Sequence, residues 1–263
     1  KYAGGGALVD TTTPGIGRDP LALQRISRAT GLQVVLGGGF YVSIAHPLEV
    51  ETMSEEEIAE GIIHDVTKGV SDTGVKTGII GEIGCSYPLH PNERKVLRAS
   101  GMAQKETGAP ITVHSSGPEE SRIRAIEDLV EGGAQPQKVV MGHLDGFSNN
   151  KKAITNLAET GCYLELDVFG WETSTLELDH SDLLWSTDVQ RIEAIEFLIE
   201  AGYLERIVIG QDVSQKWMYT GYGGKGFAHI LENIVPRMRK RGFTEEQLDV
   251  ILTKNPATAL TFA

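Results

Sequence analysis

The chain has 263 residues, of which 40% are hydrophobic, enough for one large core, and a single β/α barrel needs about 250 residues. The formal net charge is −12 at pH 7 and the sequence contains no basic stripe, so nucleic acid and anionic membranes are not expected as partners. The longest apolar runs have the length of strands, which argues against a membrane span. Cys85 and Cys162 lie far apart and outside any CxxC pattern, so a reduced, cytoplasmic protein is the simplest expectation.

Short apolar runs alternate with longer helical patterns along the whole chain. The runs are rich in Val, Ile and Leu, as expected for parallel strands that are covered on both faces. The predicted strands span 6–10, 33–37, 77–82, 110–114, 138–143, 162–168 and 206–212. Their alternation with helices is typical of a parallel sheet with crossover connections.

Helix start and stop signals fall between these strands. Asp19 precedes Pro20 at the start of one predicted helix, and Gly31 ends it. Ser54 and Glu57 form the pattern of a capping box at the start of the next helix. Further helices are predicted over 91–107, 119–132, 149–160, 188–201 and 226–241, with a short one that begins at Thr244. We find no internal repeat, linker or low-complexity segment, which favours one domain over 1–263.

A closed barrel of this kind has eight strands, and one is missing from the predicted set. The chain begins at Lys1 rather than at Met, close to a segment that we interpret as the second strand of a barrel. We therefore predict the α/β class and a (β/α)8 TIM-type barrel whose first β-strand is missing from this chain, so that the domain is N-terminally incomplete.

Four predicted strands end on a residue of a type that binds metal ions. These residues are Glu82, His114, His143 and Asp212. Taken alone, each histidine would be read as a buried structural residue, and a buried acid without a partner is costly. The carboxyl ends of all strands of a parallel barrel lie on one face, where the active sites of this fold are built. Two imidazoles and two carboxylates on one face suit a divalent metal ion better than other chemistry.

The other polar residues near these positions carry weaker predictions. Asp145 follows His143 by two residues, and either orients a metal ligand or caps the next helix. Surface or structural roles are expected for the remaining histidines, which are His46, His64, His90, His180 and His229. Of these, His90 lies in the loop that follows Glu82.

Seven segments spread over the chain share one resemblance. They read GALVDTTTPGIGRDP, GIIGEIGCSYPLHPNERKVLRASGMAQKETGAPITVHSS, KVVMGHLD, CYLELDVFG, RIVIGQDVSQK, YGGKGFAHILENIVPRMRKRG and NPATALTF. Together they resemble the phosphotriesterase family of the amidohydrolase superfamily. The stretches GEIGCSYPL and YGGKGF are most similar to the phosphotriesterase-related, resiniferatoxin-binding-protein-like branch of that family.

The resemblance implies a distorted (β/α)8 barrel that holds two divalent metal ions, commonly zinc, with manganese, cobalt or iron as alternatives. His114 and His143 match the two histidines of the more exposed ion. Asp212 matches an aspartate on the buried ion that also accepts a proton from the bridging water. Glu82 falls where many relatives carry a carboxylated lysine that bridges both ions, and its own carboxylate needs no such modification.

The sequence departs from the family at one important position. The family carries a His-x-His pair at the end of the first strand, where it holds the buried ion, and this chain starts after that position. Without the pair, the exposed ion keeps Glu82, His114 and His143, whereas the buried ion keeps only Glu82 and Asp212. Two carboxylates alone hold zinc poorly, so one ion would be weak or missing.

Five further residues are predicted near the substrate, which are Tyr87, Asp167, Lys216, Tyr222 and Lys225. Asp167 lies at the end of a strand whose tip approaches the substrate in many relatives. The last three lie in the glycine-rich loop after Asp212, which covers the site in the family and resembles a mobile lid. A flexible surface loop without a substrate role is an equal alternative for this segment.

These observations predict a metal-dependent hydrolase in which metal ions activate a water molecule and Asp212 accepts its proton. No motif for a serine or cysteine nucleophile is evident. The favoured substrate is a small carboxylic ester, lactone or N-acyl amide. Organophosphate hydrolysis is the first alternative, and a non-catalytic ligand-binding barrel is the second if the His-x-His pair is truly absent. The expected partner is a small molecule, and the resemblance allows a homodimer.

Overall fold

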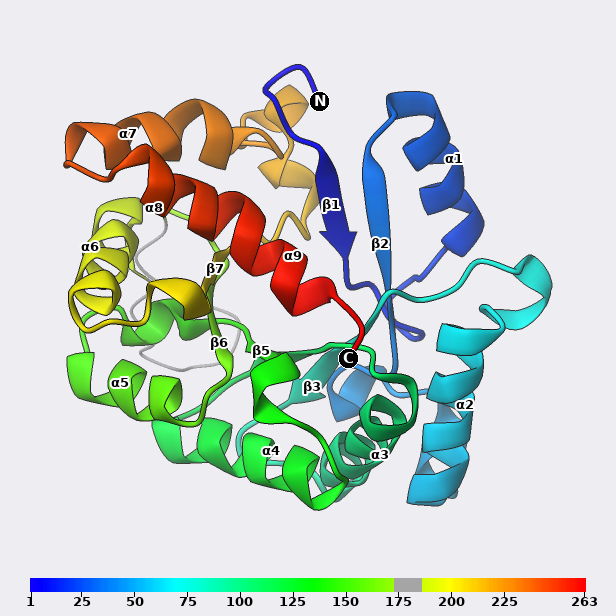
Figure 1. The fold of residues 1–263 in the computed structure, drawn as a ribbon. Coiled ribbons are helices and arrows are strands. Elements are labelled where there is room, and N and C mark those ends of the chain that lie inside the picture. Colours follow the sequence, from blue (N-terminus) through cyan, green and yellow to red (C-terminus); the bar gives the residue numbers. More distant parts are fainter. Residues whose placement is uncertain (173–185) are drawn as a thin grey trace.

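The computed structural model describes residues 1–172 and 186–263, whose seven strands form one curled parallel sheet surrounded by helices (Figure 1). The strands follow one another in chain order, and each pairs in parallel with the next. They are β1 (Ala7–Asp10), β2 (Gln33–Gly38), β3 (Ile79–Cys85), β4 (Ile111–Ser115), β5 (Val139–Met141), β6 (Tyr163–Leu166) and β7 (Ile207–Ile209). This TIM-barrel-like arrangement confirms the predicted fold class.

Helices follow the strands and pack around the outside of the sheet (Figure 1). They are α1 (Pro20–Thr30), α2 (Glu55–Thr67), α3 (Pro91–Thr107), α4 (Glu119–Glu131), α5 (Lys151–Glu159), α6 (Asp188–Glu200), α7 (Val235–Lys240), α8 (Glu245–Asp249) and α9 (Asn255–Leu260). A π-helical stretch, Ile230–Ile234, runs directly into α7, so the predicted helix 226–241 has two parts. In the described part of the chain, every helix is too short or too polar to cross a membrane.

The predicted helix signals act as expected. Asp19 caps α1 by accepting a hydrogen bond from the Ala22 N–H at 2.9 Å, and Gly31 ends the helix with φ of 67°. Ser54 and Glu57 form both hydrogen bonds of the capping box at α2. His90 caps α3 in the same way, since its Nδ1 accepts from the Asn92 N–H. His90 therefore has a structural role at the start of this helix.

Several strands end at other residues than predicted. β5 ends at Met141 and β7 at Ile209, before the metal-ligand candidates that follow them. The chain then leaves the extended conformation at His143 (φ 56°) and Asp212 (φ 40°), which have left-handed backbone. In contrast, β3 continues to Cys85, so Glu82 lies within its strand rather than at the tip.

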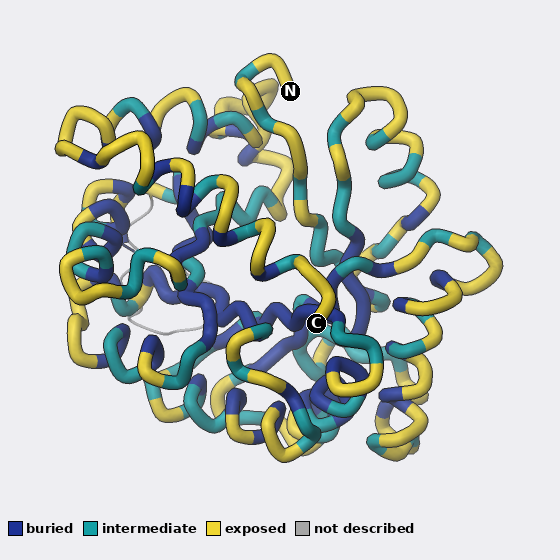
Figure 2. The backbone as a smooth tube through the Cα atoms, in the orientation of Figure 1, coloured by how far each residue is buried: buried dark blue, intermediate teal, exposed yellow. Residues whose placement is uncertain are grey.

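The core is concentrated around the strands from β3 to β7, which Figure 2 shows as a buried centre. β1 has only β2 as a paired neighbour and alternates between exposed and half-buried residues. Within the described residues, β1 and β7 are the two edges of the curled sheet. The buried core therefore lies around β3 to β7, the part of the sheet that also carries the predicted metal ligands.

Candidate metal centre

Three side chains converge from β3, from β4 and from the segment that follows β5. Glu82, His114 and His143 each offer one donor atom, and these atoms lie within 4.8 Å of one another. His114 Nδ1 lies 2.6 Å from His143 Nε2, and Glu82 Oε1 lies 3.3 Å from the same Nε2. Two acceptor nitrogens at this distance repel each other unless a proton or a metal ion lies between them. Among the described residues, only these three form such a group.

An irregularity in β3 aims Glu82 into this group. The register of β3 against β4 shifts between Ile80 and Ile83, which is the pattern of a bulge. Gly81 precedes Glu82 with φ of 127°, and a Cβ at Gly81 would collide with the carbonyl oxygen of Thr112. Only glycine fits this close approach of two strands, which explains the Gly-Glu sequence in an otherwise apolar run.

Backbone strain is concentrated at two of the predicted ligands. Among the described residues other than glycine, positive φ occurs at Ser71, His143 and Asp212. This conformation is uncommon for side chains with a Cβ and persists where the surroundings impose it. Two of the three positions are metal-ligand candidates, in the segments that follow β5 and β7.

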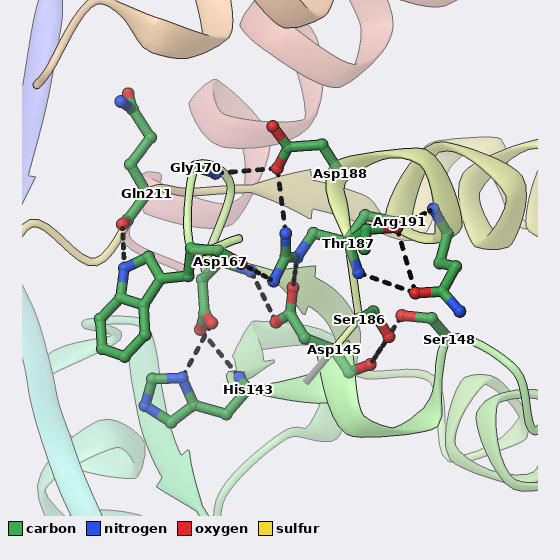
Figure 3. Close-up of polar contacts among 12 residues, drawn as sticks. His143, Asp145, Ser148, Asp167, Gly170, Ser186, Thr187, Asp188, Arg191 and Gln211 are labelled. Atoms are coloured by element: carbon green, nitrogen blue, oxygen red, sulfur yellow. Dashed lines mark hydrogen bonds and ion pairs between the residues drawn. The ribbon is translucent and has the colours of Figure 1, made fainter. Parts of the chain in front are cut away.

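Asp167 holds His143 with both of its carboxylate oxygens (Figure 3). Oδ2 accepts from the backbone N–H of His143 at 2.8 Å, and Oδ1 lies 2.8 Å from its Nδ1. Nδ1 is therefore the donor, and Nε2 is directed toward Glu82 and His114. Burial lowers the pKa of His143, but Asp167 and Glu82 outweigh it and hold this pKa well above its usual value. The same two carboxylates that raise this pKa would also favour a cation at Nε2.

Glu82 is ionised by the same arrangement. Burial raises the pKa of Glu82, but His114 and His143 outweigh it and hold the pKa of this carboxyl well below its usual range.

The pKa of Asp212 is shifted in the opposite direction. Burial, together with the charges of Asp167 and Glu82, raises it to about 7 against the opposing effect of His143. Glu82 and His143 thus interact electrostatically with Asp212. Asp212 is nevertheless not one of the three residues whose donor atoms lie within 4.8 Å of one another.

Asp145 orients its neighbours and does not cap a helix. Its carboxylate accepts from the backbone N–H of Asp167 at 3.0 Å and from Arg191 Nε at 2.6 Å. The cap of α5 is instead Asn150, which accepts from the Ala153 N–H. Of the two roles that the sequence left open for Asp145, its contacts favour the support of the segment that holds His143.

The remaining predicted substrate residues lie outside the three-donor group. Tyr87 is exposed, and so are Lys216, Tyr222 and Lys225 in the loop after β7. Lys216 Nζ lies 4.7 Å from the centre of the Tyr222 ring, within the range of a cation–π contact. Their contact with a substrate stays a prediction. His180 lies outside the described residues.

The sequence reasoning missed two residues of the site. The Tyr41 hydroxyl, from the loop after β2, lies 3.1 Å from His114 Nδ1, and its ring packs at 4.6 Å from that of His114. No spacing or motif marks this loop residue in advance. Glu165, in β6, lies two positions before Asp167, which directly follows the strand, and it interacts electrostatically with Asp167, His143 and Glu82. This alternation was the signal that could have found it.

The role of Asp167 as the partner of His143 can be tested by substitution. Asp167→Asn replaces one of the two acceptor oxygens with a donor group, so the variant loses one of the two hydrogen bonds to His143. We expect zinc to bind about 10- to 100-fold more weakly, as for other partners of metal-binding histidines. Competition with a chelator measures this affinity. Asp72→Asn, the same chemical change at an exposed position, serves as the control. Affinities within twofold of each other for the two variants would contradict the assigned role.

Comparisons with known proteins agree with the geometry. The Phosphotriesterase family matches residues 1–260. The chain is 42% identical over 262 residues to the N-acetyltaurine hydrolase of Homo sapiens, a match that covers 100% of this chain and 75% of that protein. A resiniferatoxin-binding protein from Rhodobacter sphaeroides superposes with a TM-score of 0.94 at 34% identity, over 98% of this chain and 72% of that one.

A lactonase from Listeria monocytogenes superposes with a TM-score of 0.85 at 26% identity, over 100% of this chain and 83% of that one. The similarity therefore extends over the whole chain in both sequence and fold, and it includes the segments that carry the three-donor group. On these grounds, the chain belongs to the phosphotriesterase family of metal-dependent hydrolases.

Proposed function

We propose that the chain hydrolyses a small carboxylic ester, lactone or N-acyl amide in a metal-dependent reaction. The observation that carries this proposal is the convergence of Glu82, His114 and His143 on one position. When bound there, a divalent cation supplies a Lewis acid and lowers the pKa of a coordinated water. Side chains of this chain would hold the cation and accept the proton from the water.

The donor set fits such a cation. Two imidazole nitrogens and one carboxylate oxygen are the ligands of many zinc sites that keep a fourth position open for water. The surroundings carry an excess of acidic groups over cationic ones, because Glu165, Asp167 and Asp212 lie near Glu82, whereas the nearby Asp145 is already paired with Arg191. Among the described residues, no lysine or arginine pairs with Glu82 or Asp212. A divalent cation would balance this excess.

The number of ions follows from the donor atoms available at each position. We propose one firmly held ion at Glu82, His114 and His143, and a second, weaker one between Glu82 and Asp212. Two carboxylates are a poor donor set for zinc, so manganese, cobalt or iron are alternatives at the second position. In this arrangement Glu82 would contribute a ligand to both positions, and Asp212 would accept a proton from the attacking water.

The substrate class is supported by the relatives. The human relative is named for the hydrolysis of N-acetyltaurine, an N-acyl amide, and the Listeria neighbour is named a lactonase. Both names describe attack on a carbonyl carbon, so we rank carbonyl substrates above phosphotriesters. Lys216 and Lys225 are exposed in the loop after β7 and are our candidates for pairing with an anionic group of the substrate.

A substrate panel with controlled metal content tests the proposal. The panel contains N-acetyltaurine and other N-acetyl amines, lactones, carboxylic esters and phosphotriesters, each with zinc or manganese and with a chelator. We expect turnover of a carbonyl substrate that the chelator abolishes and added zinc restores. Highest activity on phosphotriesters would reverse the ranking. Zinc binding without turnover of any member would support the alternative of a non-catalytic ligand-binding barrel.

We further propose a cytoplasmic location, a small-molecule substrate rather than nucleic acid or a membrane as the partner, and assembly into a homodimer. The location is supported by Cys85 and Cys162, which are both buried and unpaired with one another. The dimer is proposed by analogy with relatives alone. Light scattering after size exclusion distinguishes a dimer from a monomer of 28.5 kDa.

A further inference from the structure

A fully buried arginine lies behind the metal centre. Arg191, in the first turn of α6, donates from Nε to Asp145 Oδ1 at 2.6 Å and from NH1 to Asp188 Oδ1 at 3.0 Å (Figure 3). Its NH2 donates to the carbonyl oxygen of Trp171 at 3.3 Å. The planar guanidinium group thus has one partner for each of its three nitrogens, in an arrangement that the ammonium group of lysine cannot reproduce.

From this guanidinium a short chain of contacts leads to a metal-ligand candidate. Asp145 uses one oxygen for Arg191 and the other for the backbone N–H of Asp167. Asp167 in turn holds both the backbone N–H and the Nδ1 of His143. Every member of this chain is at least nine-tenths buried, so water does not compete with the contacts. The orientation of the His143 ring therefore depends on where Arg191 holds Asp145.

The opposite side of the guanidinium is also anchored. Asp188 accepts from the Gly170 N–H at 2.8 Å and pairs with His229 Nε2 at 2.8 Å. The indole N–H of Trp171 donates to the carbonyl oxygen of Gln211, the residue before Asp212. Arg191 thus joins the segments that follow β5 and β6 to α6 and, through Trp171, to the segment after β7. Arg191 is thus connected, directly or through Trp171, to the segments that follow three neighbouring strands.

We propose that Arg191 is a positioning residue of the metal centre, which fixes the His143 imidazole through Asp145 and Asp167. This inference rests on the proposed function, because it assumes that His143 binds a metal ion. Stability alone is a weak explanation for the network, since a buried ion pair is often no more stabilising than apolar side chains of similar volume. An orienting role instead requires the directional contacts that the guanidinium provides.

Zinc affinity is the measurement that separates an orienting role from a structural one. We compare the parent with Arg191→Lys, which keeps the charge but loses the planar fork, by competition with a chelator. We expect binding to weaken at least tenfold, in the range for outer partners of metal ligands. Asp128→Asn is the matched control, because Asp128 is also fully buried and paired with arginines, at the distant α3–α4 contact. It should lower the unfolding midpoint of the metal-free protein and leave zinc affinity unchanged.

A double variant keeps the test decisive if single variants fold poorly. Arg191→Met combined with Asp145→Asn removes both charges of this pair, and Asp188 keeps its contacts with the Gly170 N–H and His229. We expect the unfolding midpoint to recover toward that of the parent while zinc affinity stays low. Recovery of both quantities, or parental affinity in Arg191→Lys, would overturn the inference and leave the proposed function intact. A parent protein that binds no zinc would overturn the proposed function as well.

Discussion

Asp212→Asn is expected to lower kcat by about 10²- to 10⁴-fold, the contribution that a positioned proton acceptor typically makes. The amide has nearly the same size as the carboxylate but cannot accept the proton. Asp212 follows β7 in a left-handed backbone conformation, which asparagine tolerates better than most residues, so the fold should be retained. The effect is therefore expected in the rate rather than in stability. The measurement is kcat on the best substrate of the panel at saturating zinc.

Saturating zinc matters because Asp212 is also proposed to bind the second ion. A loss of rate that zinc restores would show that Asp212 acts only as a ligand, whereas a loss that persists supports proton transfer. Asp249→Asn, at an exposed position at the end of α8, is the matched control and should retain the parental rate. A near-native kcat in Asp212→Asn with intact metal content would remove Asp212 from the mechanism.

The sequence was sufficient to predict the fold and the face that carries the site. Parallel strands place their carboxyl ends on one face, so Glu82, His114 and His143 could be expected to meet once the strands were recognised. Helix starts such as Asp19 and Ser54 were also predictable, because a cap is formed by residues three positions apart. These features depend on short stretches of chain or on a general property of the fold.

Other features depend on contacts between distant segments and could not be predicted in this way. Tyr41 reaches His114 across 73 residues of chain, and Arg191 reaches Asp145 across 46. One signal for Arg191 was present, since it shares a helical face with Ala194, Ile195 and Leu198, which are all buried. An arginine within an apolar face requires a buried acid, although the sequence does not say which one. The left-handed conformations of His143 and Asp212, after β5 and β7, likewise follow no residue pattern.

Glu82→Gln is expected to have the largest effect on metal content. Glu82 is the carboxylate of the three-donor group, and it faces both histidines, at 3.3 Å from His143 and 3.6 Å from His114. The glutamine amide retains the shape but removes the negative charge, which leaves two neutral imidazoles to hold a dication. Loss of a direct ligand should exceed the effect of an outer partner, so we expect zinc affinity to fall by more than about 100-fold.

Metal content per chain after dialysis against dilute zinc measures this loss, together with competition against a chelator. Glu56→Gln, at an exposed position on α2, is the matched control and should keep the parental metal content. If Glu82 bridges two ions, its replacement should remove both, because each ion then loses a ligand. Loss of one ion alone would restrict Glu82 to a single ion. Unchanged metal content in Glu82→Gln would contradict both assignments and with them the metal centre proposed here.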